Sequence, residues 1–135
     1  MESSNPAEAV KVLKAANDLI AAFGNHRRDE YFSCFAPEST FIFYSSDRTF
    51  HSRDEYEKEW RTWEDAGLRF VSCDSTDQRV AELGPGVFLF THRVRTTLQQ
   101  GGSSQQLEER ESIVFRLDPN GGYLAVHEHL SPYPS

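Results

Sequence analysis

The sequence has a shortage of basic residues and no long hydrophobic run. Its 14 Lys and Arg residues are outnumbered by 21 Asp and Glu residues, which gives a formal net charge of −7 and a pI of about 5.2. An acidic surface repels nucleic acid and anionic lipid, so we expect neither a nucleic-acid nor a membrane partner. No apolar stretch approaches the roughly 20 residues that span a bilayer.

Cysteine is also scarce, with only Cys34 and Cys73. Small secreted domains normally use more cysteines to build a disulfide framework. Residues 1–7 lack the basic and apolar regions of a secretion signal, so we expect a cytoplasmic protein. Phosphate-binding loops, nucleophile triads and metal-helix motifs are missing from the sequence, so we predict no metal or organic cofactor.

Aromatic residues are plentiful, with ten Phe, five Tyr and two Trp. Large rings commonly line concave cavities. A chain of 135 residues fits one domain, and we predict a single domain over residues 1–135.

The first half of the chain is predicted to be mainly helical. Asn5 and Pro6 form a helix start, apolar residues recur at helical spacing, and Gly24 ends the pattern. A short helix over residues 27–35 and a strand over 40–44 follow. A capping box then starts a third helix over residues 52–67, whose inner face includes two tryptophans.

From residue 68 the hydrophobic period changes to two, which indicates strands. Short Gly-containing turns separate four of them, so we predict an antiparallel meander. Helices followed by a long sheet are typical of the α+β class, with the helices covering one face. The predicted strands are 68–80, 86–98, 105–117 and 123–130.

Alternation along each strand separates an inner from an outer face. We assign the more apolar set to the inner side, and an uncovered apolar outer face indicates a partner subunit. We therefore predict a homodimer through that outer face. The inner set is Val87, Leu89, Arg93, Ile113, Leu124, Val126, Glu128 and Leu130. The outer set is Phe88, Phe90, His92, His127 and His129.

Residues 126–131 (VHEHLS), after the turn DPNGG, resemble the closing strand of SnoaL-like proteins in the nuclear transport factor 2-like superfamily. The association domain of calcium/calmodulin-dependent kinase II shares this strand. The order of the elements is similar over nearly the whole chain. The resemblance implies a cone-shaped roll, in which a curved antiparallel sheet surrounds a pocket covered by three N-terminal helices, usually in a dimer.

Ketosteroid isomerases of this superfamily need three proton-handling side chains. The resemblance places those positions at Leu19, Phe43 and Ile113, none of which exchanges a proton. We therefore do not expect this isomerase activity.

Glu128 is the most informative polar residue, because a carboxylate on an apolar strand face needs a partner. Arg93 is the predicted partner, with Arg95 as the alternative. Such a pair could orient a ligand, but we favour a structural ion pair. Glu109 and Glu111 could add acid–base chemistry in the pocket, although we favour a solvated position at the rim for Glu109.

His127 and His129 could bind a metal, but we favour interface histidines because no further ligands converge. Trp60 and Trp63 could fill the core or stack on a ligand. The predicted ligand-binding residues are Phe43, Trp60, Trp63, Arg93, Glu111, Ile113, Glu128 and Leu130.

Three functions remain open at this point. The first, which we favour, is a small-molecule-binding protein with an apolar pocket. The second is a cofactor-independent cyclase, dehydratase or isomerase that uses pocket carboxylates. The third is an association module whose function is oligomerisation.

Overall fold

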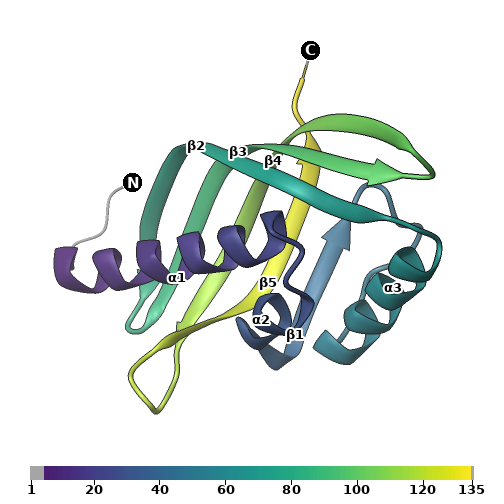
Figure 1. Ribbon diagram of the computed structural model, residues 1–135. Helices are drawn as coiled ribbons and strands as arrows, with labels where there is room; N and C mark the ends of the chain where they lie inside the picture. The colour runs from purple at the N-terminus through teal and green to yellow at the C-terminus, as the bar shows by residue number, and fades with distance from the viewer. Residues whose placement is uncertain (1–4, 135) are drawn as a thin grey trace.

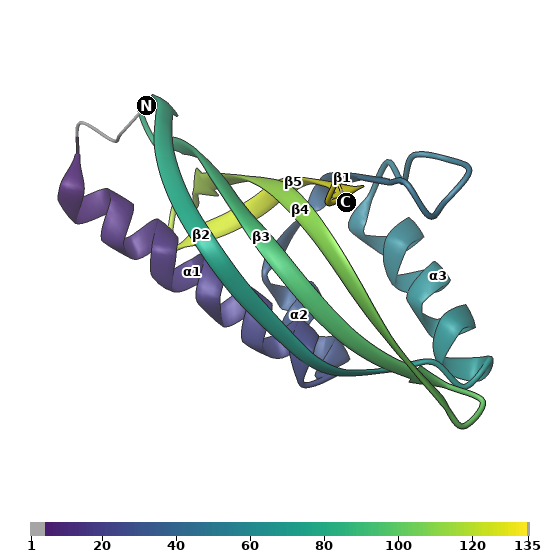
Figure 2. The ribbon, with the colours of Figure 1, turned by 90° about the horizontal axis from the view of Figure 1, so that it is seen from above.

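The computed structural model describes residues 5–134, so the first four of the seven residues considered for a secretion signal lie outside the described range. Five strands form one curved sheet, and three helices lie on its concave side (Figure 1). Seen from above, the long strands arch over the helices (Figure 2). The predicted α+β roll is confirmed. Within residues 5–134, no helix is long and apolar enough to cross a membrane.

The helices begin close to their sequence signals. Helix α1 spans Pro6–Gly24, α2 spans Arg28–Ser33 and α3 spans Arg53–Asp65. The Ser52 side chain caps α3 by accepting a hydrogen bond from the backbone N–H of Glu55 at 3.1 Å. This cap fixes the start of α3 at its sequence signal.

The last residue of α1, Gly24, packs directly on the sheet. A Cβ atom there would lie 2.8 Å from Cβ of Cys73, on the first strand of the meander, and 2.9 Å from its backbone nitrogen. Only glycine allows this approach, which closes one end of the concave side.

The strands follow in the order β1-β5-β4-β3-β2. Strands β2 to β5 form the predicted antiparallel meander, whereas β1 pairs with β5 in parallel. Strand β1 also begins earlier than predicted, because Phe35 already pairs with Ala125 of β5, and the register then shifts before Thr40. The bounds are β1 Phe35–Phe43, β2 Arg69–Gly84, β3 Val87–Gln100, β4 Ser103–Leu117 and β5 Tyr123–Pro132.

The predicted faces of β3 are inverted. Phe90 is directly opposite Ile113, and opposed residues share a face of the sheet. Phe90 is also 0% exposed, so it lies on the inner face with Ile113. The outer-face assignment of Phe88, Phe90 and His92 is therefore wrong, and so is their place in a dimer surface. All three side chains are buried on the inner side, whereas Val87, Leu89 and Arg93 face outward.

A bulge in β5 shifts the alternation of its side chains between the inner and outer faces. The pairing with β4 passes from Ala125 to His127 and skips Val126, so the alternation changes phase there. The inward assignment of Leu124 and Val126 is therefore wrong. The residues on the inner side are Tyr123, Ala125, Glu128 and Leu130. His127 and His129 lie on the outer side, as predicted.

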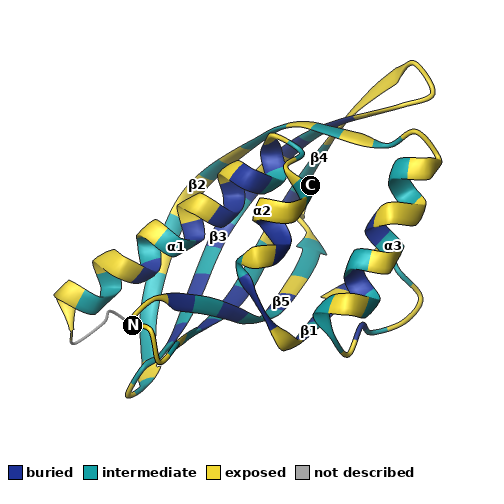
Figure 3. Cartoon of the chain, turned by 60° about the horizontal axis from the view of Figure 1, so that its bottom comes forward, coloured by how far each residue is buried: buried dark blue, intermediate teal, exposed yellow. Residues whose placement is uncertain are grey.

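Buried positions gather on the inner side of the sheet and on the helix faces turned toward it (Figure 3). Aromatic rings make most of this core. Trp60 of α3 is fully buried and contacts the rings of Phe23, Tyr31, Phe32 and Phe70. This ring cluster holds the three helices together on one side of a cavity.

Candidate ligand-binding cavity

A cavity of about 730 Å³ lies between the helices and the concave side of the sheet. This volume is within the range of sites for small molecules, roughly 300–1,000 Å³. Most of its wall is apolar and comes from every layer of the fold. Representative wall residues are Leu19 and Phe23 of α1, Phe43 of β1, Trp63 of α3, Leu98 of β3 and Leu130 of β5.

Five polar side chains meet in the wall of this cavity: Tyr31, Tyr56, His92, Glu111 and Glu128, here called the polar cluster. The Tyr31 hydroxyl lies 3.3 Å from both carboxyl oxygens of Glu128 and 2.9 Å from the Tyr56 hydroxyl. Nε2 of His92 lies 2.8 Å from Oε1 of Glu111. The Glu111 and Glu128 carboxyl groups are close enough to shift each other's pKa, so the polar cluster joins side chains of α2, α3, β3, β4 and β5.

Burial keeps the Glu111 and Glu128 carboxyl groups protonated to unusually high pH. Burial raises the pKa of Glu128 well above its ordinary value, and the neighbouring Glu111 raises it further. Burial likewise raises the pKa of Glu111 to about 7. Because two adjacent buried carboxylates repel each other, the pair retains at least one proton at neutral pH.

His92 is neutral, since burial lowers its pKa to about 4. A neutral imidazole that donates from Nε2 to Glu111 accepts at Nδ1, and there the hydroxyl of Ser75 lies 2.7 Å away. The histidine thus orients Glu111 without supplying a positive charge.

Glu109 also lies inside, which corrects the solvated rim position that the sequence favoured. Its side chain is buried and lines the cavity, and the Tyr44 hydroxyl donates to its Oε2 at 2.6 Å. Burial raises the pKa of Glu109. Glu109, Glu111 and Glu128 therefore bring three largely buried carboxyl groups to one cavity.

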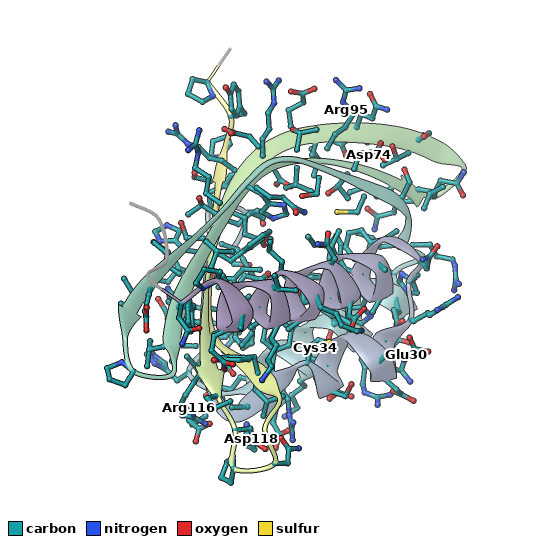
Figure 4. All side chains as sticks on the ribbon, turned by 90° about the vertical axis from the view of Figure 1, so that its left-hand side faces the viewer. Glu30, Cys34, Asp74, Arg95, Arg116 and Asp118 are labelled. Atoms are coloured by element: carbon teal, nitrogen blue, oxygen red, sulfur yellow. The ribbon has the colours of Figure 1, made fainter. Side chains whose placement is uncertain are left out.

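The predicted Glu128–Arg93 pair is wrong. Arg93 follows the inward-facing His92, so alternation directs it to the outer face. There it forms an ion pair with Glu108, and its guanidinium lies 3.9 Å from the centre of the Tyr133 ring. The alternative partner, Arg95, also binds Glu108, at 2.7 Å, and it points away from the helices (Figure 4).

The structure brings together five of the eight predicted ligand-binding residues. Phe43, Trp63, Glu111, Glu128 and Leu130 line the cavity. Trp60 and Ile113 are fully buried behind the wall, and Arg93 is outside. Sequence reasoning missed Tyr31, Tyr56 and His92. For Tyr31 and Tyr56, the available signal was that each places a hydroxyl on the otherwise apolar face of a helix.

Within the part of the chain that the structure describes, no group of three or more His, Cys, Asp or Glu side chains is arranged to hold a metal ion. The rings of His127 and His129 lie 6.3 Å apart on the outer face at 86° to each other. Nδ1 of His127 is instead hydrogen-bonded to the Thr40 hydroxyl at 2.7 Å.

The curved sheet, the three helices and the enclosed cavity define a cone-shaped α+β roll. Residues 12–135 match the SnoaL-like domain, and the chain belongs to that family. No curated protein sequence matches the chain.

Solved structures show the same fold at low sequence identity. A ketosteroid isomerase-like protein from Erwinia carotovora atroseptica has a TM-score of 0.81 at 11% identity, over 95% of this chain and 98% of that one. A scytalone dehydratase-like protein from Novosphingobium aromaticivorans has a TM-score of 0.81 at 12% identity, over 96% and 87%.

A third similar structure is a calcium/calmodulin-dependent protein kinase II association domain-like protein from Xanthomonas campestris. Its TM-score is 0.78 at 18% identity, over 100% of this chain and 96% of that one. At these identities the likeness establishes the fold alone.

Proposed function

We propose that this protein binds a small, largely apolar molecule in the cavity, with the polar part of the ligand at the polar cluster. The observation that carries the proposal is a cavity of about 730 Å³ whose mostly apolar wall holds the convergent polar cluster. Binding sites for small molecules have this composition, because apolar surface supplies affinity and a few polar groups fix orientation.

The energetics of the polar cluster support a functional role. Glu128 is only 3% exposed and forms no ion pair with a Lys or Arg among residues 5–134, and burial of such a group costs stability. A core selected for stability alone would be better filled by apolar side chains. Perturbed carboxyl groups in a concave site are typical of functional sites.

Ligand binding can be tested by filling the cavity. Val94 of β3 is buried and lines it, so Val94→Phe should occupy the ligand volume. Leu89→Phe is the matched control, because Leu89 lies on the outer face of the same strand. In a screen of small apolar compounds read by thermal shift and by Trp63 fluorescence, the native protein and Leu89→Phe should respond alike, and Val94→Phe should not. Equal responses from all three proteins would contradict binding in the cavity.

One observation favours a second candidate, an acid–base enzyme that needs no cofactor. The pKa of Glu111 is raised to about 7, which suits a group that must both accept and donate a proton near neutral pH. The similar fold of a scytalone dehydratase-like protein is compatible with this chemistry. If it is correct, the native protein should accelerate deuterium exchange next to the carbonyl of cyclic ketones in D₂O, followed by NMR. Glu111→Gln should abolish the acceleration, and unaccelerated exchange in the native protein would exclude this reaction for such ketones.

A further inference from the structure

The cavity wall brings Glu109, Glu111 and Glu128 together near aromatic rings, and no Lys or Arg of the described residues lies among these three carboxyl groups. The geometry points to a charge-selective site for apolar amines, in which the ammonium group lies among Glu109, Glu111 and Glu128 and the apolar body contacts the rings. This inference rests on the proposed ligand-binding function and names the class of ligand.

The three carboxyl groups come from adjacent strands. Glu109 and Glu111 are two residues apart on β4 and therefore share a face. Glu128 of β5 is paired with Ile113, the next inward residue of β4, so it lies diagonally next to Glu111. This register concentrates potential negative charge in one part of the wall.

The positive charge in the wall lies elsewhere. Arg48, in the segment between β1 and α3, is the only Lys or Arg among the described residues that line the cavity. Its guanidinium lies 3.5 Å from the Glu59 carboxylate and 4.8 Å from the centre of the Phe50 ring, and its side chain is more than half exposed. Asp47 lies next to Arg48 in the wall. Arg48 is thus already engaged with an acid and gives the cavity no free site for an anion.

The other titratable groups that face the carboxyls are neutral at physiological pH. Burial lowers the pKa of His92 and raises that of the tyrosines and the thiol. They are Tyr31 of α2, Tyr44 after β1, Tyr56 of α3, Cys73 of β2 and His92 of β3. None of them supplies the counter-charge that ionised carboxylates would need.

An ammonium group would supply that counter-charge. Bound protons reduce the negative charge of the Glu111–Glu128 pair at neutral pH, and a bound cation would replace them. The rings of Phe43, Tyr56 and Trp63 line the same cavity, and their faces attract cations. A carboxylate or phosphate ligand would instead meet like charge or force further protonation, so the site should reject it.

Three compounds with one apolar body test this charge preference: 4-phenylbutylamine, 4-phenylbutan-1-ol and 4-phenylbutyrate. We expect the amine to bind the native protein at least about tenfold more tightly than the alcohol in calorimetry at pH 7, with no measurable binding of the carboxylate. Amine binding should release protons, seen as a heat that depends on the ionisation enthalpy of the buffer. It should also tighten from pH 5.5 to pH 8 as the carboxyls ionise.

Two cavity variants and one control locate the effect. Glu111→Gln and Glu128→Gln should each weaken amine binding about tenfold or more and leave alcohol binding within about twofold. Glu108→Gln is the control, because Glu108 binds Arg93 and Arg95 on the outer face. It should change neither affinity.

The outcomes separate this inference from the proposed function. If the alcohol or the carboxylate binds in the cavity as tightly as the amine, the charge preference is overturned and the ligand-binding function stands. If none of the three compounds binds and the Val94→Phe comparison also shows no cavity ligand, both are overturned. Unchanged amine affinity in both glutamine variants would overturn the placement of the ammonium group.

Discussion

Nε2 of His92 lies 2.8 Å from Oε1 of Glu111, its partner across the β3–β4 ladder. Burial moves the pKa values of the two groups in opposite directions, to about 4 for His92 and to about 7 for Glu111. The folded protein therefore favours the neutral form of both side chains. Ionisation of Glu111 therefore lowers stability as the pH rises, and protonation of His92 lowers it as the pH falls.

On the alkaline side, Glu111→Gln should flatten the pH dependence. The folded pKa of Glu111 is raised from about 4.5 to about 7, so its contribution to stability is complete below pH 4.5 and is lost as the pH rises to 7. The loss should be on the order of 3 kcal/mol. Urea unfolding at pH 5 and pH 8 should show a smaller difference for the variant than for the native protein. An identical slope in both proteins would contradict the buried, protonated state.

On the acidic side, His92→Gln should have the converse effect. The folded pKa of His92 is lowered from 6.5 to about 4, so its contribution is complete above pH 6.5 and is lost as the pH falls to 4. The variant keeps a donor toward Glu111 but cannot become charged. It should lose less stability than the native protein between pH 6.5 and pH 4, measured by urea unfolding. A variant that loses as much would show that His92 is not the responsible group.

Arg93→Ala should have little effect on stability or on the cavity. The Arg93–Glu108 pair is half exposed, and such pairs contribute at most about 1 kcal/mol. Removal of a buried partner of Glu128 would instead cost about 3–5 kcal/mol. The free energy of unfolding in urea distinguishes the two values, and a large loss would restore an interior role for Arg93.

Trp60→Ala and Trp63→Ala should differ although the residues lie one helical turn apart. Trp60 is fully buried among rings, so its truncation should cost about 3–5 kcal/mol. Trp63 is only partly buried and lines the cavity, so its truncation should cost less and remove the fluorescence response to ligand. Equal destabilisation would show that Trp63 is also a core residue.

The sequence predicted the fold well because its signals are local. Caps and glycines mark the helix ends, as at Asn5 and Gly24, and a period of two marks the long strands after residue 68. The inward position of Glu111, Ile113 and Glu128 also followed from alternation. These features depend on residues close together in the chain.

The errors arose where alternation is ambiguous or interrupted. In β3 both sets are apolar, so hydrophobicity could not decide between Leu89 and Phe90, and one wrong choice also placed Arg93 inside. In β5 the bulge at Val126 changes the phase without a glycine or proline to mark it. The hydroxyl contact of Tyr31 with Glu128 spans 97 residues, and no local pattern predicts it.

The homodimer stays a prediction, and the structure changes the residues that test it. Leu89, Val114 and His127 form one row across β3, β4 and β5 on the outer face. If a second copy covers this face, Leu89→Asp with Val114→Asp should convert a dimer to a folded monomer in light scattering. Phe90→Asp is unsuitable, because a charge at a fully buried position would unfold the protein.

Gln105→Asp is the matched control, because Gln105 is exposed near the turn that joins β3 and β4, far along the strand from Val114. It adds the same charge to β4 and should leave the mass unchanged. Circular dichroism should show that the double variant stays folded, since both substituted side chains are only partly buried in one subunit. If the native protein has the mass of one subunit at micromolar concentration, no second copy covers the outer face of the sheet. The half-buried side chains of Leu89 and Val114 would then be ordinary surface, as many folded monomers have.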